Sequence, residues 1–147
     1  MGISLSDLSA KAREQVVAKL AIEQVKKIKQ AEKPSKYHAE KVESRLADGT
    51  PHTFDSVKEA KRYSELAILL RAGEITDLRV QVPFELIPKQ KKADGKEERP
   101  CSYVADFVYK DNHGNEIVED TKGIRTKEYI IKRKIMLWRY GITIKEV

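Results

Sequence analysis

The sequence predicts an α/β or α+β fold, in which a mixed sheet of four or five strands is flanked by helices and preceded by an N-terminal helical arm. Two observations carry this prediction: three strand-like segments follow the clearest helical segment, and a second helical segment separates them from a last strand. The 147 residues fit one domain, and the 40% of hydrophobic residues suffice for a core. We therefore expect an arm and linker over residues 1–36 and a domain over residues 37–147.

The N-terminal arm is predicted as a helix over residues 4–31, which Ser4 or Ser6 can cap and which Pro34 ends before a linker over residues 33–38. An approximate apolar stripe follows one side of this helix and consists of Leu5, Leu8, Ala12, Val16, Leu20 and Ile28. Because the stripe is narrow, it suits packing against one partner helix or a neighbouring protomer better than burial in a core. A solvated helix that touches nothing is the alternative.

A hairpin and a second helix are predicted next. Residues 41–54 form short alternating runs around Asp48-Gly49, which is typical of a small hairpin. Residues 56–72 form the clearest helix, because Ser56-x-x-Glu59 fits a capping box and Gly73 stands where a helix ends. The apolar side of that helix consists of Ala60, Tyr63, Leu66, Ala67 and Leu70.

The remaining elements are expected in the order of strands over residues 78–87, 101–110 and 116–122, a basic amphipathic helix over residues 127–139, and a last strand over residues 142–147. Between the first two strands, the lysine-rich connection over residues 88–100 is expected to be mobile. Residues 111–115 are expected to form a tight polar turn that contains Gly114.

The composition excludes membrane-spanning and disulfide-bonded classes of protein. No segment approaches about 18 consecutive apolar residues, and Cys101 as the one cysteine allows neither an internal disulfide nor a cysteine zinc cage within this chain. The first 33 residues are too charged for a secretory signal, so we expect a protein of the reducing cytoplasm. The net charge of +6 is concentrated in residues 122–147, which contain eight basic and two acidic residues. This excess indicates a polyanionic partner, although a well-solvated surface is an alternative.

Two aspartates are predicted to face each other across adjacent strands. A turn symmetric about His113 pairs Lys110 with Glu116, Val108 with Val118, Asp106 with Asp120, and Val104 with Lys122. Opposed carboxylates repel each other, and a divalent cation such as Mg²⁺ between them removes the repulsion. Lys122 can then orient a water molecule or offset charge on a phosphate. The alternative is a pair of exposed aspartates, one of which Lys122 neutralises. The other face of the first of these strands is expected to carry Tyr103, Ala105, Phe107 and Tyr109.

Two motifs carry a resemblance to a nuclease superfamily. Ala105-Asp106-Phe107, followed by Val118-Glu119-Asp120-Thr121-Lys122-Gly123, resembles the split D…(D/E)-x-K signature of PD-(D/E)XK nucleases, and the second motif is especially similar to phage junction-resolving endonucleases of the endonuclease I type. Over about residues 37–147, a family of phage and prophage proteins usually placed in that superfamily shares further motifs, namely Phe54-Asp55-Ser56, Glu59-Ala60, Arg62-Tyr63, Ala72-Gly73-Glu74-Ile75, Gln81-x-Pro83-Phe84 and Tyr140-Gly141-Ile142. Ala105 departs from the proline common in the superfamily, and Glu119 is expected to face away from Asp120.

The resemblance implies a restriction-endonuclease-like fold and a magnesium-dependent endodeoxyribonuclease in which Mn²⁺ would substitute. By position it assigns Asp106, Asp120 and Glu59 as catalytic and metal-binding carboxylates, the Thr121 carbonyl as a further ligand, and Lys122 as the catalytic lysine. For Glu59 the capping box is the alternative role. Gln81 either reaches the site or is an ordinary strand residue.

By analogy, the resemblance further implies cleavage of branched DNA, such as a Holliday junction, during phage recombination or packaging in a bacterial host cell. Symmetric cleavage needs two sites, so a homodimer is expected, with the N-terminal helix as one means of forming it. The residues expected to bind DNA are Arg125, Lys127, Lys132, Arg133 and Lys134, with a solvated helix face as the alternative. Tyr129 and Trp138 could stack on bases, but their helical spacing favours core packing. The rival functions are a nicking enzyme, an exonuclease, a transposase-like end-cleaving nuclease and a non-catalytic DNA-binding protein with the same fold.

Overall fold

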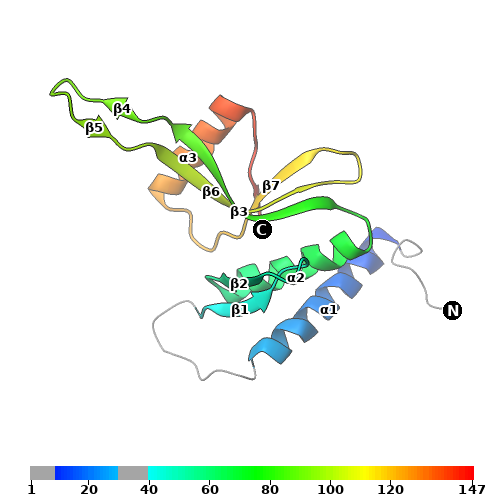
Figure 1. Ribbon diagram of the computed structural model, residues 1–147. Helices are drawn as coiled ribbons and strands as arrows, with labels where there is room; N and C mark the ends of the chain where they lie inside the picture. Colours follow the sequence, from blue (N-terminus) through cyan, green and yellow to red (C-terminus); the bar gives the residue numbers. More distant parts are fainter. Residues whose placement is uncertain (1–8, 30–39) are drawn as a thin grey trace. The chain divides into compact units, whose positions relative to one another are not determined.

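The computed structural model describes residues 9–29 and 40–147 (Figure 1). The chain divides into two compact units, Met1–Leu78 and Arg79–Val147. The sequence instead predicted a boundary at residues 36/37. The difference arises because the N-terminal helix packs with the hairpin and the second helix into one body, rather than standing apart as an arm.

The first unit contains α1 (Ala10–Lys29), β1 (Val42–Arg45), β2 (Pro51–Phe54) and α2 (Val57–Arg71). The predicted hairpin is confirmed, because β1 and β2 pair antiparallel and Gly49 adopts a φ of 87° in the turn. The predicted helix is confirmed as well: Ser56 Oγ accepts the backbone N–H of Glu59 at 3.2 Å, and Gly73, with a φ of 73°, follows the last turn. The core of this unit consists of Val17, Ala21, Val42, Phe54, Ala60, Tyr63, Leu66, Ala67, Ile68 and Ile75.

Helix α1 lies along α2 (Figure 1), and it buries a different side from the predicted one. Val17 and Ala21 are buried, whereas Val16 and Leu20 of the predicted stripe are 37% and 41% exposed. A shift of one position rotates the buried side by about 100°, so the side that α2 covers was misassigned.

The predicted features outside the described backbone or side chains are the caps Ser4 and Ser6, the stripe residues Leu5, Leu8 and Ile28, and the linker over residues 33–38. Among the helices of the described ranges, none is long and apolar enough to cross a membrane.

The second unit contains most of β3 (Thr76–Ile87), β4 (Gln90–Lys91), β5 (Glu97–Glu98), β6 (Cys101–Lys110), β7 (Glu116–Asp120), α3 (Lys127–Tyr140) and β8 (Lys145–Glu146). Its main sheet has four strands in the order β3-β6-β7-β8. Strands β6 and β7 run antiparallel, and β7 and β8 run parallel, so the sheet is mixed. This confirms the predicted α+β class with a four-stranded mixed sheet, on which α3 packs.

The connection between β3 and β6 contains a short hairpin, which Figure 1 shows as a projection beyond the main sheet. Strands β4 and β5 pair antiparallel. Their ends are joined by two ion pairs of 2.7 Å, Lys89 Nζ to Glu97 Oε2 and Lys92 Nζ to Glu98 Oε2. Two of the lysines that suggested a mobile connection therefore form ion pairs with glutamates across a paired ribbon.

The alternation of side chains along β6 shifts by one residue, which corrects the predicted faces of this strand. Tyr103, Ala105 and Val108 belong to one buried cluster, although strict alternation would place Val108 on the opposite face. The predicted register is confirmed from Lys110 opposite Glu116 to Val108 opposite Val118. The shift therefore lies between Ala105 and Val108, as one extra residue in a strand produces.

Helix α3 packs on β6 through one side only. Tyr129 and Met136, seven positions apart, are buried on that side. Trp138 is 84% exposed, so the expectation that it packs in the core is wrong. Two residues along a helix correspond to about 200°, which turns Trp138 away from the side that Met136 buries.

Candidate functional site

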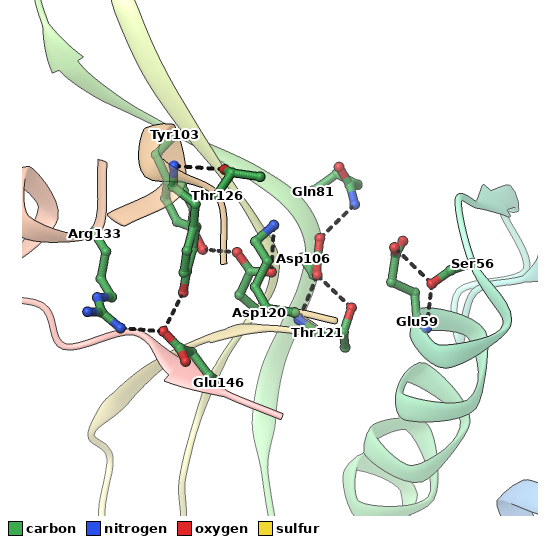
Figure 2. Close-up of polar contacts among 12 residues, drawn as sticks. Ser56, Glu59, Gln81, Tyr103, Asp106, Asp120, Thr121, Thr126, Arg133 and Glu146 are labelled. Carbon is green, nitrogen blue, oxygen red and sulfur yellow. Dashed lines mark hydrogen bonds and ion pairs between the residues drawn. The ribbon is translucent and has the colours of Figure 1, made fainter. Parts of the chain in front are cut away.

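Asp120, the last residue of β7, is a fully buried carboxylate with one strong hydrogen bond. Its Oδ2 atom accepts the hydroxyl of Tyr103 at 2.6 Å (Figure 2), and its side chain has 0% exposure. Its Oδ1 atom accepts no hydrogen bond within the described chain and lies 3.1 Å from Lys122 Nζ. The group that the described residues place beside the buried Oδ1 atom is the ammonium of Lys122, so this position suits a cation.

The pKa of Asp120 is raised above its usual range. Burial is the largest cause, and the nearby charge of Asp106 raises the pKa further. The hydrogen bond from Tyr103 and the ammonium of Lys122 lower it in part. The ionised form of Asp120 therefore costs free energy in the absence of an additional positive charge.

Asp106 on β6 lies next to Asp120 but is held by Thr121. Its Oδ2 atom accepts both the backbone N–H and the hydroxyl of Thr121, each at 2.8 Å. Its Oδ1 atom accepts the side-chain amide of Gln81 at 3.4 Å (Figure 2). The predicted pairing of Asp106 directly opposite Asp120 is thus wrong, because the β6–β7 ladder ends with Phe107 opposite Glu119 and the carboxylate of Asp106 bonds to Thr121 instead. Of the two roles considered for Gln81, the contact with Asp106 places it in the site.

Lys122 lies beyond the end of β7, since the strand stops at Asp120 rather than at the predicted residue 122. The predicted pairing of Val104 with Lys122 therefore does not occur within a strand. The ammonium of Lys122 lies 4.9 Å from the centre of the Tyr129 ring as well as 3.1 Å from Asp120 Oδ1. The aromatic face and the carboxylate together hold the ammonium beside the acid.

Glu146 on β8, which was not among the residues predicted from the sequence, organises the basic residues beside the site. Its Oε1 atom accepts the hydroxyl of Tyr129 at 3.0 Å and Arg133 Nη1 at 2.7 Å, and its Oε2 atom forms an ion pair with Arg125. The hydrogen bond from Arg133 is the main reason why the pKa of Glu146 lies below its usual value. Glu146 is the lone acid of the last strand within a basic segment, which was the available signal. Asp120 pairs with it in the parallel ladder.

The residues expected to bind DNA fall into two groups. Arg125 and Arg133 are paired with Glu146, and Lys132 forms an ion pair of 2.8 Å with Glu128. The remaining two, Lys127 and Lys134, have exposed side chains and no ion pair within the described residues.

Glu119 faces away from Asp120, as predicted. It is completely buried, and its Oε2 atom accepts the hydroxyl of Tyr109 at 2.8 Å and lies 3.3 Å from Lys145 Nζ. Because consecutive strand residues point to opposite faces, this acid and its lysine belong to a different environment from that of Asp120.

Glu59 belongs to the first unit, where it caps α2. Its Oε1 atom accepts the hydroxyl of Ser56 at 3.1 Å, and its Oε2 atom accepts the backbone N–H of Asp55 at 3.3 Å. The capping role foreseen from the sequence is therefore confirmed. The role of Glu59 in a metal site stays a prediction.

The donor atoms in the second unit suit a hard cation in number and kind. No group of three or more histidine, cysteine, aspartate or glutamate side chains is arranged for a metal ion in the described part of the chain. Mg²⁺ commonly binds through one or two carboxylates and keeps several water molecules. Asp106, Asp120 and the carbonyl of Thr121 would provide two carboxylates and one carbonyl oxygen. This set fits Mg²⁺, and the Oδ1 atom of Asp120 is the observation that supports it.

Comparison with known proteins gives one family. Residues 34–145 match the model of a family described as protein of unknown function (DUF1064). Neither a curated protein nor a solved structure matches the chain significantly. The match covers more than half of the chain.

Proposed function

We propose that this chain, which belongs to the DUF1064 family, is a divalent-metal-dependent endodeoxyribonuclease. It hydrolyses DNA phosphodiesters with Mg²⁺, and Mn²⁺ substitutes for Mg²⁺. One observation carries this proposal: the fully buried carboxylate of Asp120, whose pKa is raised, lies beside a second aspartate and has the ammonium of Lys122 3.1 Å from its Oδ1 atom. Metal-assisted phosphodiester hydrolysis can use such a combination, in which the carboxylates hold the metal ion and the lysine offsets charge on the phosphate. The resemblance to PD-(D/E)XK nucleases assigns the same three residues.

The proposed roles follow from the contacts. Asp106, Asp120 and the Thr121 carbonyl hold the metal ion, which when bound polarises the phosphate and favours ionisation of a water molecule. Tyr103 orients Asp120 by donating to Oδ2, so that Oδ1 points away from the hydroxyl. The ammonium of Lys122, at the rim of the buried acid, stabilises negative charge that develops on the phosphate oxygens.

A purely structural ion pair is the main alternative. Asp120 and Lys122 alone would satisfy it, because a buried acid needs one positive partner. A structural ion pair does not explain why Asp106 is present. The carboxylate of Asp106 raises the pKa of Asp120 and therefore makes the buried negative charge of Asp120 more costly. Such an arrangement favours a site that acts on a ligand.

For the substrate we propose branched DNA, with duplex DNA as the simpler alternative, in phage recombination or packaging. Two cuts in a junction need two sites, so we also propose a homodimer. Val16 and Leu20 on α1 are exposed and four residues apart, and they are the surface through which α1 would contact a second protomer.

The decisive experiment compares cleavage of matched duplex, flap, single-stranded and four-way DNA in Mg²⁺, Mn²⁺ and EDTA. We expect cuts near the branch of flap or four-way DNA that require metal and disappear in Asp106→Asn. Nicks, processive end degradation or end-specific cuts would instead identify a nicking enzyme, an exonuclease or a transposase-like enzyme. Metal-independent binding with no cleavage in either metal would contradict the nuclease proposal and leave a DNA-binding protein.

A further inference from the structure

The side of α3 opposite the core carries a regular exposed stripe. Lys127, Ile131, Lys134 and Trp138 follow one another at intervals of four, three and four residues, which places them on one side of a helix. All four are exposed, Ile131 by 59% and Trp138 by 84%. We call these four residues the α3 stripe. Met136, on the buried side, lies about half a turn away.

The stripe combines positive charge with an aromatic ring. Glu128 is the one acidic residue of α3, and it forms its ion pair with Lys132 outside the stripe. Lys127 and Lys134 take part in no ion pair within the described residues, so their charges face solvent. An indole ring on the same side of a helix as two ammonium groups suits a ligand with anionic groups and flat rings, which are the components of a nucleic acid strand.

We propose that the α3 stripe binds an unpaired strand of DNA, with a base stacked on Trp138 and backbone phosphates near Lys127 and Lys134. The inference rests on the proposed function and names its substrate class as DNA that has an unpaired strand beside the cleaved bond. An unpaired strand is required because the faces of bases in a duplex are covered by their neighbours. Lys127 and Trp138 are separated by about 16 Å along the helix, so the stripe is long enough to contact several nucleotides of one strand.

Trp138 is the only tryptophan in the sequence, so it reports on its own environment. The experiment titrates the full-length protein in EDTA with an oligothymidylate and with a blunt duplex of equal length, and follows tryptophan emission. We expect the oligothymidylate to quench the emission strongly and the duplex to quench it much less. Binding is measured in parallel by the anisotropy of a labelled oligothymidylate.

Substitutions separate stacking from charge. Trp138→Ala should weaken oligothymidylate binding by about tenfold, whereas Trp138→Phe should keep most of it. Leu137→Ala is the matched control, because Leu137 is 54% exposed on the same helix but lies outside the stripe; its affinity should be that of wild type. Combining Lys127→Ala with Lys134→Ala should reduce the slope of log affinity against log salt by about 1.4.

Three results would overturn the inference: binding without quenching, equal affinities of Trp138→Ala and Leu137→Ala, or loss of a dimer in Trp138→Ala by light scattering with no quenching by oligothymidylate. The last result would assign the stripe to a second copy of the chain. Since these readouts need no metal and no cleavage, the two proposals fail separately. Cleavage without quenching would leave the nuclease without this strand site, and quenching without cleavage would leave the strand site without the nuclease.

Discussion

Thr121 donates both its backbone N–H and its hydroxyl to the Oδ2 atom of Asp106, each at 2.8 Å. The pair joins β6 to the residue directly after β7 and holds the Asp106 carboxylate close enough to raise the pKa of Asp120. Both donors occupy one oxygen, and the second oxygen of Asp106 accepts the side-chain amide of Gln81. The position of this carboxylate therefore depends on a threonine.

Removing the threonine hydroxyl should loosen Asp106 while the backbone contact remains. We expect Thr121→Val to lower the free energy of unfolding by about 1–2 kcal/mol and the single-turnover cleavage rate by about tenfold. Thr121→Ser is the control, since it keeps the hydroxyl and should stay near wild type in both measurements. Equal rates for the two variants would remove Thr121 from the positioning of Asp106.

Asp120→Asn should abolish cleavage but stabilise the metal-free protein at neutral pH. The folded-state pKa of Asp120 lies above the unfolded value, so the wild type loses stability as pH rises through the interval between the two values. Asparagine does not titrate, and its carbonyl can still accept the Tyr103 hydroxyl. The variant should melt a few degrees above the wild type in EDTA at pH 7, a shift of about 2–4 °C per kcal/mol.

The comparison is made by thermal melting in EDTA over a pH series that starts at the ordinary aspartate pKa of 3.8 and rises. The difference in melting temperature between variant and wild type should grow with pH and then level off. Added Mg²⁺ should raise the melting temperature of the wild type and not that of Asp120→Asn. A constant difference at every pH would mean that Asp120 carries no excess cost when ionised.

Two substitutions at the start of α2 separate capping from metal binding. Ser56→Ala removes the cap, which should lower the free energy of unfolding by about 1 kcal/mol, and keeps the Glu59 carboxylate. Glu59→Gln keeps a residue that suits a capping box but removes the charge. We expect Glu59→Gln to reduce cleavage at least tenfold with a nearly unchanged melting temperature. Wild-type cleavage in this variant would limit Glu59 to its cap.

Arg133 should act on stability and Lys134 on DNA binding. Arg133→Ala removes the hydrogen bond that Arg133 donates to Glu146 and the positive charge beside that carboxylate. This loss should lower the free energy of unfolding by about 1 kcal/mol at neutral pH. The pKa of Glu146 is lowered, so this stabilisation is present above the ordinary glutamate pKa of 4.5 and is lost as pH falls through the lower folded-state value. Lys134→Ala should leave the melting temperature unchanged and flatten the salt dependence of DNA binding. Denaturant unfolding at two pH values and binding at several salt concentrations check both.

The features that the sequence determined by itself are local. The turn symmetric about His113 was enough to set the pairing of Lys110 with Glu116, because the register of a hairpin follows from its turn. The cap of α2 followed from Ser56 and Glu59, which are three residues apart and bond to each other's backbone or side chain. The proximity of Asp120 and Lys122 followed from two positions in one segment.

The features that only the tertiary structure decided involve distant segments or a choice between two sides of one element. The extra residue in β6 arises where the strand packs on a core. As a result, Asp106 does not pair with Asp120 as predicted, and its carboxylate accepts hydrogen bonds from Thr121. Glu146 gathers its arginines only because β8 pairs with β7. Trp138 has the same helical spacing as a core residue, and it is exposed because β6 covers the other side of α3. The periodicity of a sequence predicts a helix with different sides, but only the tertiary structure decides which of these sides is covered.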